Sequence, residues 1–389
     1  MARILPETKF YVPPPRESLV PRSRLTSLMD RAIRARLTLI SAPPGFGKTT
    51  LLADWLAGSD PGDRVVVWLS LDPTDSESGS FWTAVASGIH RALPAADAAI
   101  TMLQEAQPPP IETVVTTLVN DLDAVGRDIV LVLDDYHVIE AAEIHDQVAD
   151  LLEHLSPTVH VVITTRADPP FPVARLRAQG QLVEVRAADL RFTRDETAAY
   201  FHDAAGLDLD AGQVAALEKR TEGWIAALQL AALSLQGRDD VADFITGFTG
   251  DDRFVVDYLA EEVLERQPED VRRFLLRTCI LDRLTGALCD AVTGEEGGQS
   301  TLEVLDRRNL FVIPLDPRRE WYRYHHLFAD VLRASLLRDE PDRVADLHRR
   351  ASVWFEQRGE RSEAIRHALA GEDYERAADM IEPAIPGLR

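Results

Sequence analysis

The sequence has few cysteines, no long apolar run and no recognisable leader. Its two cysteines, Cys279 and Cys289, lie in an apolar stretch without the clustered ligands of a zinc site. We therefore expect buried core thiols in a reducing compartment. No apolar run approaches the roughly 18 to 20 residues that a membrane helix needs, and the N-terminus lacks the apolar region of a signal peptide. These absences predict a cytoplasmic protein with no membrane partner.

Positive charge is also scarce. The 389 residues contain 42 Lys and Arg against 64 Asp and Glu, which gives a formal net charge of −22. Such a balance opposes non-specific binding to nucleic acids and anionic membranes, so we expect no direct DNA binding by this chain. The composition is otherwise that of a soluble globular protein, and the length predicts two to four domains.

The first half of the chain alternates strands and helices. The first 25 residues contain five prolines and are predicted to be a non-helical, extended arm laid over the following domain. Short apolar strands are predicted at residues 37–40, 65–69, 129–133, 159–163 and 182–185, with helical patterns between them. This order predicts an α/β domain with a parallel sheet over residues 1–188.

The remainder is predicted to be mostly helical. Apolar residues at three- and four-residue spacing indicate a helical domain over residues 189–268. Three helical patterns, a hairpin and a further helix indicate a winged-helix domain over residues 269–340. Residues 341–389 resemble the start of an α-helical repeat arm. Barely one repeat is present and it cannot bury its face alone, so we expect the chain to be part of a longer protein.

The strongest motif follows the first strand. Residues 42–49, APPGFGKT, have the spacing of a P-loop, with Ala42 where the first glycine usually stands. The glycines would let backbone N–H groups wrap phosphate oxygens, while Lys48 would reach the β- and γ-phosphates and Thr49 would ligate Mg²⁺. The alternative is a chance glycine-rich turn, but the motif lies between a strand and a helix, as a P-loop requires. We predict ATP or ADP binding with Mg²⁺ by Pro44, Gly45, Phe46, Gly47, Lys48, Thr49 and Thr50.

Polar residues end two other predicted strands. Asp134 and Asp135 follow residues 129–133 in the pattern of a Walker B motif. Asp134 would hold the magnesium through water, and Asp135 would orient or deprotonate an attacking water, with Lys48 as the other catalytic residue. Arg166 ends the next strand, where a γ-phosphate could be contacted. The alternatives are helix N-caps for the aspartates and a surface ion pair for the arginine.

With these motifs in place, the chain resembles the MalT-like large ATP-binding regulators of the LuxR group, which belong to the STAND class of P-loop ATPases. The resemblance covers the whole chain. It rests on the order and separation of residues 9–10 (KF), 19–22 (LVPR), 42–49 (APPGFGKT), 134–137 (DDYH), 164–166 (TTR), 222–224 (EGW) and 322–325 (YRYH).

The resemblance implies a nucleotide-binding domain, a helical domain, a winged helix and a superhelical sensor arm, with a LuxR-type DNA-binding domain outside this chain. It implies an ADP-bound, closed, monomeric resting state that inducer and ATP open for self-association, and slow hydrolysis that resets the switch. The inducer, a small molecule or a protein, would act through the arm. His325 matches a winged-helix histidine that reaches the ADP phosphates, although the adjacent His326 leaves open which imidazole does so. Val20 and Arg22 match the segment that frames the adenine. Ile225 stands where family members often carry proline, so we expect a locally different adenine pocket.

Two other functions compete with a switch that controls transcription. An ordinary P-loop enzyme, such as a kinase or an AAA-type remodelling ATPase, would show fast, substrate-stimulated turnover. A nucleotide-locked scaffold would hydrolyse nothing in a single-turnover assay and would use its aspartates only to bind magnesium.

Overall fold

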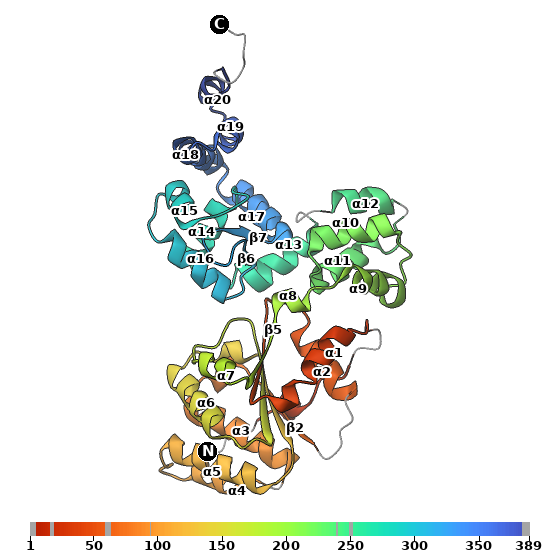
Figure 1. Cartoon of the computed structure of the whole chain (residues 1–389), viewed down its shortest axis with the longest axis vertical. Helices are drawn as coiled ribbons and strands as arrows, with labels where there is room; N and C mark the ends of the chain where they lie inside the picture. Colours follow the sequence, from red (N-terminus) through yellow and green to blue (C-terminus); the bar gives the residue numbers. More distant parts are fainter. Residues whose placement is uncertain are drawn as a thin grey trace. The chain divides into compact units, whose positions relative to one another are not determined.

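The computed structural model describes residues 5–15, 19–58, 64–93, 95–238, 240–248 and 252–382. The chain divides into two compact units (Figure 1). The first unit comprises Met1–Asp208 and Trp224–Ala226, and the second comprises Leu209–Gly223 and Ala227–Arg389. The finer division into four domains stays a prediction.

A five-stranded parallel sheet forms the centre of the first unit. Its strands, in spatial order, are β2 (Val65–Ser70), β3 (Ile129–Asp134), β4 (Val159–Thr165), β1 (Leu37–Ser41) and β5 (Leu182–Arg186). Every residue of β1, β3 and β4 is buried, which explains why these strands read as continuous apolar runs. The predicted parallel α/β sheet is confirmed, and β3 and β4 continue into the polar residues at their carboxyl ends.

Helices cover this sheet (Figure 1). The main apolar core lies between the strands and α3 (Ser78–Ala92), α5 (Ile111–Ala124) and α6 (Ala142–His154). The P-loop helix is α2 (Lys48–Gly58). The unit also contains α4 (Asp97–Gln104), α7 (Ala174–Ala178), α8 (Ala187–Leu190) and α9 (Arg194–Ala199), which continues into a π-helical turn at Tyr200–Ala204.

The prediction that the first 25 residues are non-helical is wrong. A 3₁₀ turn spans Glu7–Phe10, and helix α1 (Ser23–Met29) begins two residues after Pro21. The buried ammonium group of Lys9 lies 2.7 Å from Asp72 and 2.5 Å from Asp75, and these ion pairs hold the 3₁₀ turn. The prolines lie outside both helical segments, where their missing N–H groups interrupt no helix.

The second unit is largely helical. It begins with α10 (Ala211–Thr221), α11 (Ile225–Leu235), whose first two residues belong to the first unit, α12 (Val241–Gly247) and α13 (Arg253–Leu259) with a π-helical turn at Ala260–Leu264. The order of the winged helix follows: α14 (Glu269–Thr278), α15 (Gly286–Thr293), α16 (Gly298–Arg307), a hairpin of β6 (Val312–Pro314) and β7 (Tyr322–Tyr324), and α17 (His326–Asp339). Helix α18 (Val344–Gln357) packs on α19 (Arg361–Ala370), which packs on α20 (Tyr374–Ile381).

Both cysteines are buried, unpaired core residues, as predicted. Burial raises the pKa of the Cys279 thiol to about 12, so it is not a reactive thiolate at neutral pH. Within the described ranges, no helix combines the length and the apolar character that crossing a bilayer requires.

Candidate functional site

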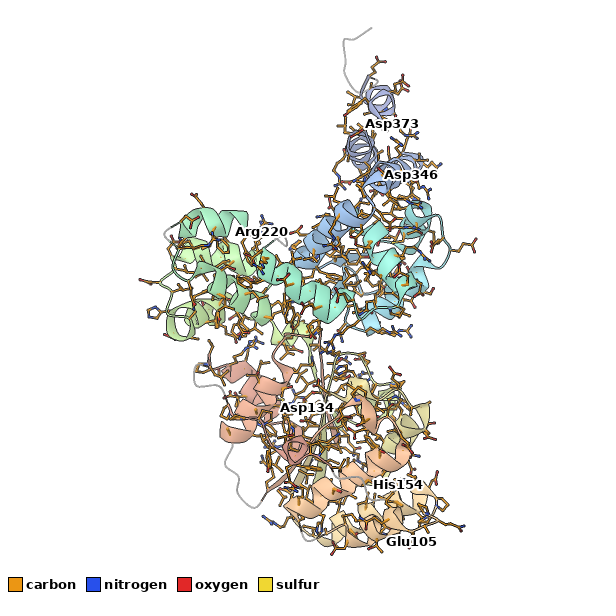
Figure 2. The ribbon with its side chains drawn as sticks, turned by 180° about the vertical axis from the view of Figure 1, so that it is seen from behind. Glu105, Asp134, His154, Arg220, Asp346 and Asp373 are labelled. Carbon is orange, nitrogen blue, oxygen red and sulfur yellow. The ribbon has the colours of Figure 1, made fainter. Side chains whose placement is uncertain are left out.

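Three polar segments meet at the carboxyl edge of the sheet in the first unit. Strands β3, β4 and β1 are consecutive neighbours, so the residues that follow them lie side by side. These residues are the aspartates at 134 and 135 (Figure 2 labels Asp134), Arg166 and the P-loop. The sheet topology therefore brings together the three motifs found in the sequence.

The P-loop places a buried cation inside its own turn. Gly45 and Gly47 have φ values of 75° and 79°, a left-handed conformation that favours glycine. The ammonium group of Lys48 donates to the carbonyl oxygens of Ala42 at 2.8 Å and Pro43 at 3.1 Å. Burial lowers the pKa of Lys48 to about 8, an effect that the aspartates at 134 and 135 oppose and Arg166 reinforces. Arg166 is thus close enough to act on the lysine electrostatically.

Asp134 is a buried carboxylate held by two hydroxyl groups. The Thr49 hydroxyl donates to it at 3.1 Å from the start of α2, and Thr164 donates to it from β4. Burial is the main cause that raises the pKa of Asp134, and repulsion from Asp135 adds to it. The hydrogen bonds from the two hydroxyl groups and the charge of Lys48 lower this pKa, but the net shift is upward. Asp134 therefore lies beside the P-loop threonine that is predicted to ligate magnesium.

Asp135 has a different environment, although it is the next residue. Its side chain is about half exposed, at 49%, and one carboxylate oxygen lies 3.7 Å from Nδ1 of His137. Its backbone has a φ of 58°, and its N–H group donates to the Thr164 hydroxyl at 3.0 Å. The left-handed turn directs consecutive carboxylates into different surroundings, one enclosed and one open to water.

The charges of this site fit a magnesium nucleotide. Lys48 is a buried cation whose pKa is lowered, and Asp134 is a buried anion whose pKa is raised. Both shifts mean that contacts within the protein do not fully replace the hydration that each charged group loses on burial. Phosphate oxygens beside Lys48 and a divalent cation beside Thr49 and Asp134 would supply the missing partners.

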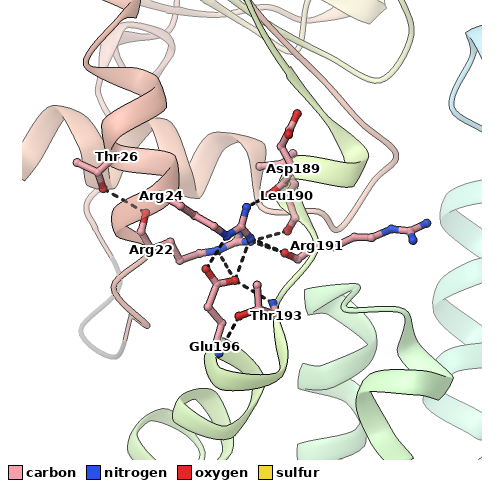
Figure 3. A network of polar contacts seen from close by, with 8 residues as sticks. All are labelled: Arg22, Arg24, Thr26, Asp189, Leu190, Arg191, Thr193 and Glu196. Atoms are coloured by element: carbon pink, nitrogen blue, oxygen red, sulfur yellow. Dashed lines mark hydrogen bonds and ion pairs between the residues drawn. The ribbon is translucent and has the colours of Figure 1, made fainter. Parts of the chain in front are cut away.

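Arg22 is held by a polar network in the first unit (Figure 3). It donates to the carbonyl oxygens of Leu190 and Arg191, each at 2.8 Å, and to the Glu196 carboxylate at 3.2 Å. Its guanidinium also lies 4.3 Å from the centre of the Phe192 ring, and burial lowers its pKa to about 10. Val20, two residues earlier, is half-buried. The Arg22 side chain is occupied by these contacts. Its predicted role in framing the adenine would therefore be indirect: the side chain would hold the backbone of this segment in position.

A short segment after α10 contacts the P-loop within the first unit. The Trp224 indole donates to the carbonyl oxygen of Pro44 at 3.2 Å, and its ring stacks on Phe46 with centroids 6.4 Å apart. The Ala226 N–H group donates to the carbonyl oxygen of Gly45, also at 3.2 Å. A Cβ on Gly47 would lie 3.7 Å from the Ile225 side chain, so the residue that replaces the expected proline lies against the loop.

The preceding residues are held within the second unit. The Glu222 carboxylate accepts two hydrogen bonds from Arg323, both at 2.7 Å, and one from the His326 backbone N–H at 3.2 Å. Burial opposes its charge, but Arg323 and His325 lower the pKa of Glu222 to about 2. Nε2 of His325 donates to the carbonyl oxygen of Thr221 at 3.0 Å. Gly223, with a φ of 69°, is the single residue between the contacts of Glu222 and those of Trp224.

The two histidines differ sharply in exposure. The whole of His325 is 1% exposed, whereas the His326 side chain is 54% exposed and lies 3.2 Å from Glu222. His325 belongs to the second unit and Lys48 to the first, so a contact between His325 and nucleotide phosphates stays a prediction.

The sequence motifs included Thr164, Trp224, Glu222 and Arg323, but they did not predict three contacts: the bonds of Thr164 to both aspartates, the contact of Trp224 with the P-loop, and the ion pair of Glu222 with Arg323. A signal for Thr164 existed, because it ends the strand beside the aspartates. The other two contacts join residues 180 and 101 positions apart, which no local pattern reveals.

The parallel sheet, the glycine loop and the aspartate at the end of β3 define a P-loop NTPase fold of the Walker type. Residues 260–344 match the family model of the MalT winged helix domain. Over 368 residues the chain is 34% identical to the HTH-type transcriptional regulator MalT of Klebsiella pneumoniae, covering 94% of this chain and 40% of that protein. The winged-helix region thus matches the MalT family model, and nearly the whole chain is similar to the corresponding part of MalT.

Another relative is the serine/threonine-protein kinase PknK of Mycobacterium tuberculosis, which is 37% identical over 378 residues, covering 97% of this chain and 34% of the kinase. The chain thus spans between about a third and two fifths of the length of these curated relatives. Among solved structures, the Walker-type ATPase PABY2304 of Pyrococcus abyssi has a similar fold, with a TM-score of 0.54 at 15% identity, covering 83% of this chain and 99% of that one.

Proposed function

We propose that this chain is the nucleotide-dependent switch of a transcriptional regulator. It binds ADP in a closed, monomeric resting state and self-associates when ATP replaces ADP, and slow hydrolysis returns it to rest. The observation that carries this proposal is the pair of buried, incompletely compensated charges, Lys48 and Asp134, at the mouth of a P-loop.

The roles of the chain's own residues follow from this geometry. Lys48 would turn from the carbonyl oxygens of Ala42 and Pro43 to the phosphates, and the loop N–H groups would bind phosphate oxygens. Thr49 and Asp134 would hold Mg²⁺, which neutralises phosphate charge when bound. Asp135, half exposed and next to His137, would orient or deprotonate the attacking water. Arg166 would contact the γ-phosphate.

The segment around Gly223 supports a switch more than a constitutive enzyme. Trp224 and Ala226 contact the backbone of the P-loop, while Glu222 is held by the winged-helix hairpin through Arg323. A change in the loop on nucleotide exchange would therefore reach the winged helix through one intervening glycine. Two packed arrangements that differ in such contacts are what a ligand needs to shift a population.

The test combines nucleotide content with assembly state. The purified chain should carry ADP, and sedimentation velocity should find a monomer with ADP and a larger species with ATP and Mg²⁺. Exchange of ADP for ATP should be measurable whether or not the chain self-associates. Lys48→Ala should bind neither nucleotide, because it removes the buried cation of the loop. Fast, substrate-stimulated turnover, or wild-type nucleotide affinity in a folded Lys48→Ala variant, would contradict the proposal.

A further inference from the structure

A cavity of about 640 Å³ lies in the second unit, and none of its lining residues belongs to the P-loop. It is formed by α10, α12, β7, the first half of α17 and the residues after α14. Its volume is within the range of small-molecule sites in proteins, about 300 to 1,000 Å³. Of its lining residues, the function proposed above uses only Arg323, which holds Glu222, while His326 is the alternative to His325 as a nucleotide contact.

The charge of the cavity is opposite to that of the chain. Four cationic side chains line it, against two carboxylates, whereas the whole sequence carries a formal charge of −22. The cations are Lys219, Arg220, Arg323 and Arg333, and the carboxylates are Asp282 and Asp330. A concave basic surface on so acidic a protein selects anions from solution.

Two of the four cations already have partners. Arg323 forms the two hydrogen bonds with Glu222, and Arg333 pairs with Asp282 at 3.1 Å and with Asp330 at 3.5 Å. These ion pairs fix the positions of both guanidinium groups. They also use the lining carboxylates, so Asp282 and Asp330 do not neutralise the remaining cations.

Lys219 and Arg220 are the remaining cations, and they lie in the last turn of α10 (Figure 2 labels Arg220). Across the described ranges, neither forms an ion pair or a side-chain hydrogen bond. Arg220 is half-buried and Lys219 is exposed. The sequence contains only three lysines, of which Lys9 is held by buried aspartates and Lys48 belongs to the P-loop. The third lines this cavity.

We infer that this cavity is a second ligand site, which takes a phosphorylated small molecule. Lys219 and Arg220 both line the cavity, where an ammonium would offer a phosphate a point charge and a guanidinium two directed donors. The lining also includes Ile245, Leu281 and Ala329, whose apolar side chains would pack against a compact apolar or planar body. Ligands in such sites are oriented by a few polar groups against a mostly apolar wall.

Pyridoxal phosphate is a direct probe of this site, because it joins a phosphate to a planar ring and its aldehyde condenses with lysine amines. After borohydride reduction, peptide mass spectrometry would read Lys219 and Lys48 separately in the unaltered chain. Inorganic pyrophosphate at ten times its dissociation constant should slow labelling of Lys219 about ten-fold, whereas sodium chloride of equal ionic strength should not. No protection by pyrophosphate would overturn the inference, as would protection by a hexaglutamate peptide alone, which would mark a docking site for acidic protein segments.

A second measurement is titration calorimetry with pyrophosphate in the Lys48→Ala background, where the P-loop no longer competes. Arg220→Ala should weaken binding about ten-fold or more. The matched control is Arg308→Ala, because Arg308 is an exposed arginine outside the cavity that has no ion pair within the described part of the chain. Arg308→Ala should change the affinity for pyrophosphate less than two-fold. Equal losses of affinity in both variants would show that pyrophosphate binds through general surface charge, which would overturn the inference. These outcomes do not depend on nucleotide binding at the P-loop, so this inference and the proposed function fail separately.

Discussion

Replacing Glu222 by glutamine tests the ion pair with Arg323 that holds the segment before Gly223 to the winged-helix hairpin. Its pKa falls from 4.5 to about 2 because, despite burial, Arg323 and its neighbours stabilise the carboxylate. A shift of that size corresponds to about 3 kcal/mol of the free energy of unfolding. The pKa of the folded state is the lower one, so this stabilisation is complete above about pH 4.5 and is lost as the pH falls toward 2. We expect Glu222→Gln to cost about 2 to 3 kcal/mol at neutral pH, since glutamine keeps one acceptor for Arg323.

Hydrogen exchange at the backbone amides of α17 isolates the second unit from the rest of the chain. Amides that exchange through unfolding of this unit should exchange about 30- to 150-fold faster in Glu222→Gln at pH 7, and the difference should shrink below pH 4.5. Arg323→Gln should give a similar loss, and the double variant should lose little more than either. The control is Glu265→Gln, because Glu265 is exposed and has no ion pair in the described ranges. Equal exchange in Glu222→Gln and Glu265→Gln, or a difference that persists unchanged at low pH, would refute this reasoning.

Three further predictions concern the nucleotide. Affinity for ADP should fall as the pH rises through about 8, because free Lys48 loses its proton there and binding requires the charged form; calorimetry that finds a flat profile would contradict this. Asp135→Asn should retain ATP and hydrolyse it at least ten-fold more slowly, because an amide accepts no proton, and unchanged single-turnover hydrolysis would remove Asp135 from that role. His325→Ala should release ADP about ten-fold faster in stopped flow, whereas the exposed His326→Ala should have a smaller effect. The reverse order would identify His326 as the residue that contacts the nucleotide.

The sequence was sufficient to predict the elements that have a local apolar pattern. Strands β1, β3 and β4 are buried on both faces, so their apolar runs identified them, and the order of strands and helices predicted a parallel sheet. A parallel sheet gathers the ends of its strands, which is why the P-loop, the aspartates and Arg166, each predicted to follow a strand, meet at one edge.

Periodicity reports which face of an element is buried and does not report its partner. The hydrogen bond from Trp224 to Pro44 and the ion pair between Glu222 and Arg323 therefore had no local signal. The π-helical turns at Tyr200–Ala204 and Ala260–Leu264 were read as ordinary helix, because a shifted hydrogen-bond register barely alters the apolar spacing. The turn at Glu7–Phe10 was missed because it depends on Lys9 reaching two distant aspartates.

The contact of Trp224 with the P-loop places an intrinsic fluorophore against that loop. The indole is fully buried, its N–H group bonds to the Pro44 carbonyl, and Phe46 stacks on its ring. Its emission spectrum depends on that hydrogen bond and on the polarity around the ring, so any rearrangement of residues 44–46 should shift or quench it. The sequence has six tryptophans, and replacing the other five by phenylalanine would leave a single-tryptophan chain. Such a chain would report the state of the loop in real time, without a dye or a labelled nucleotide.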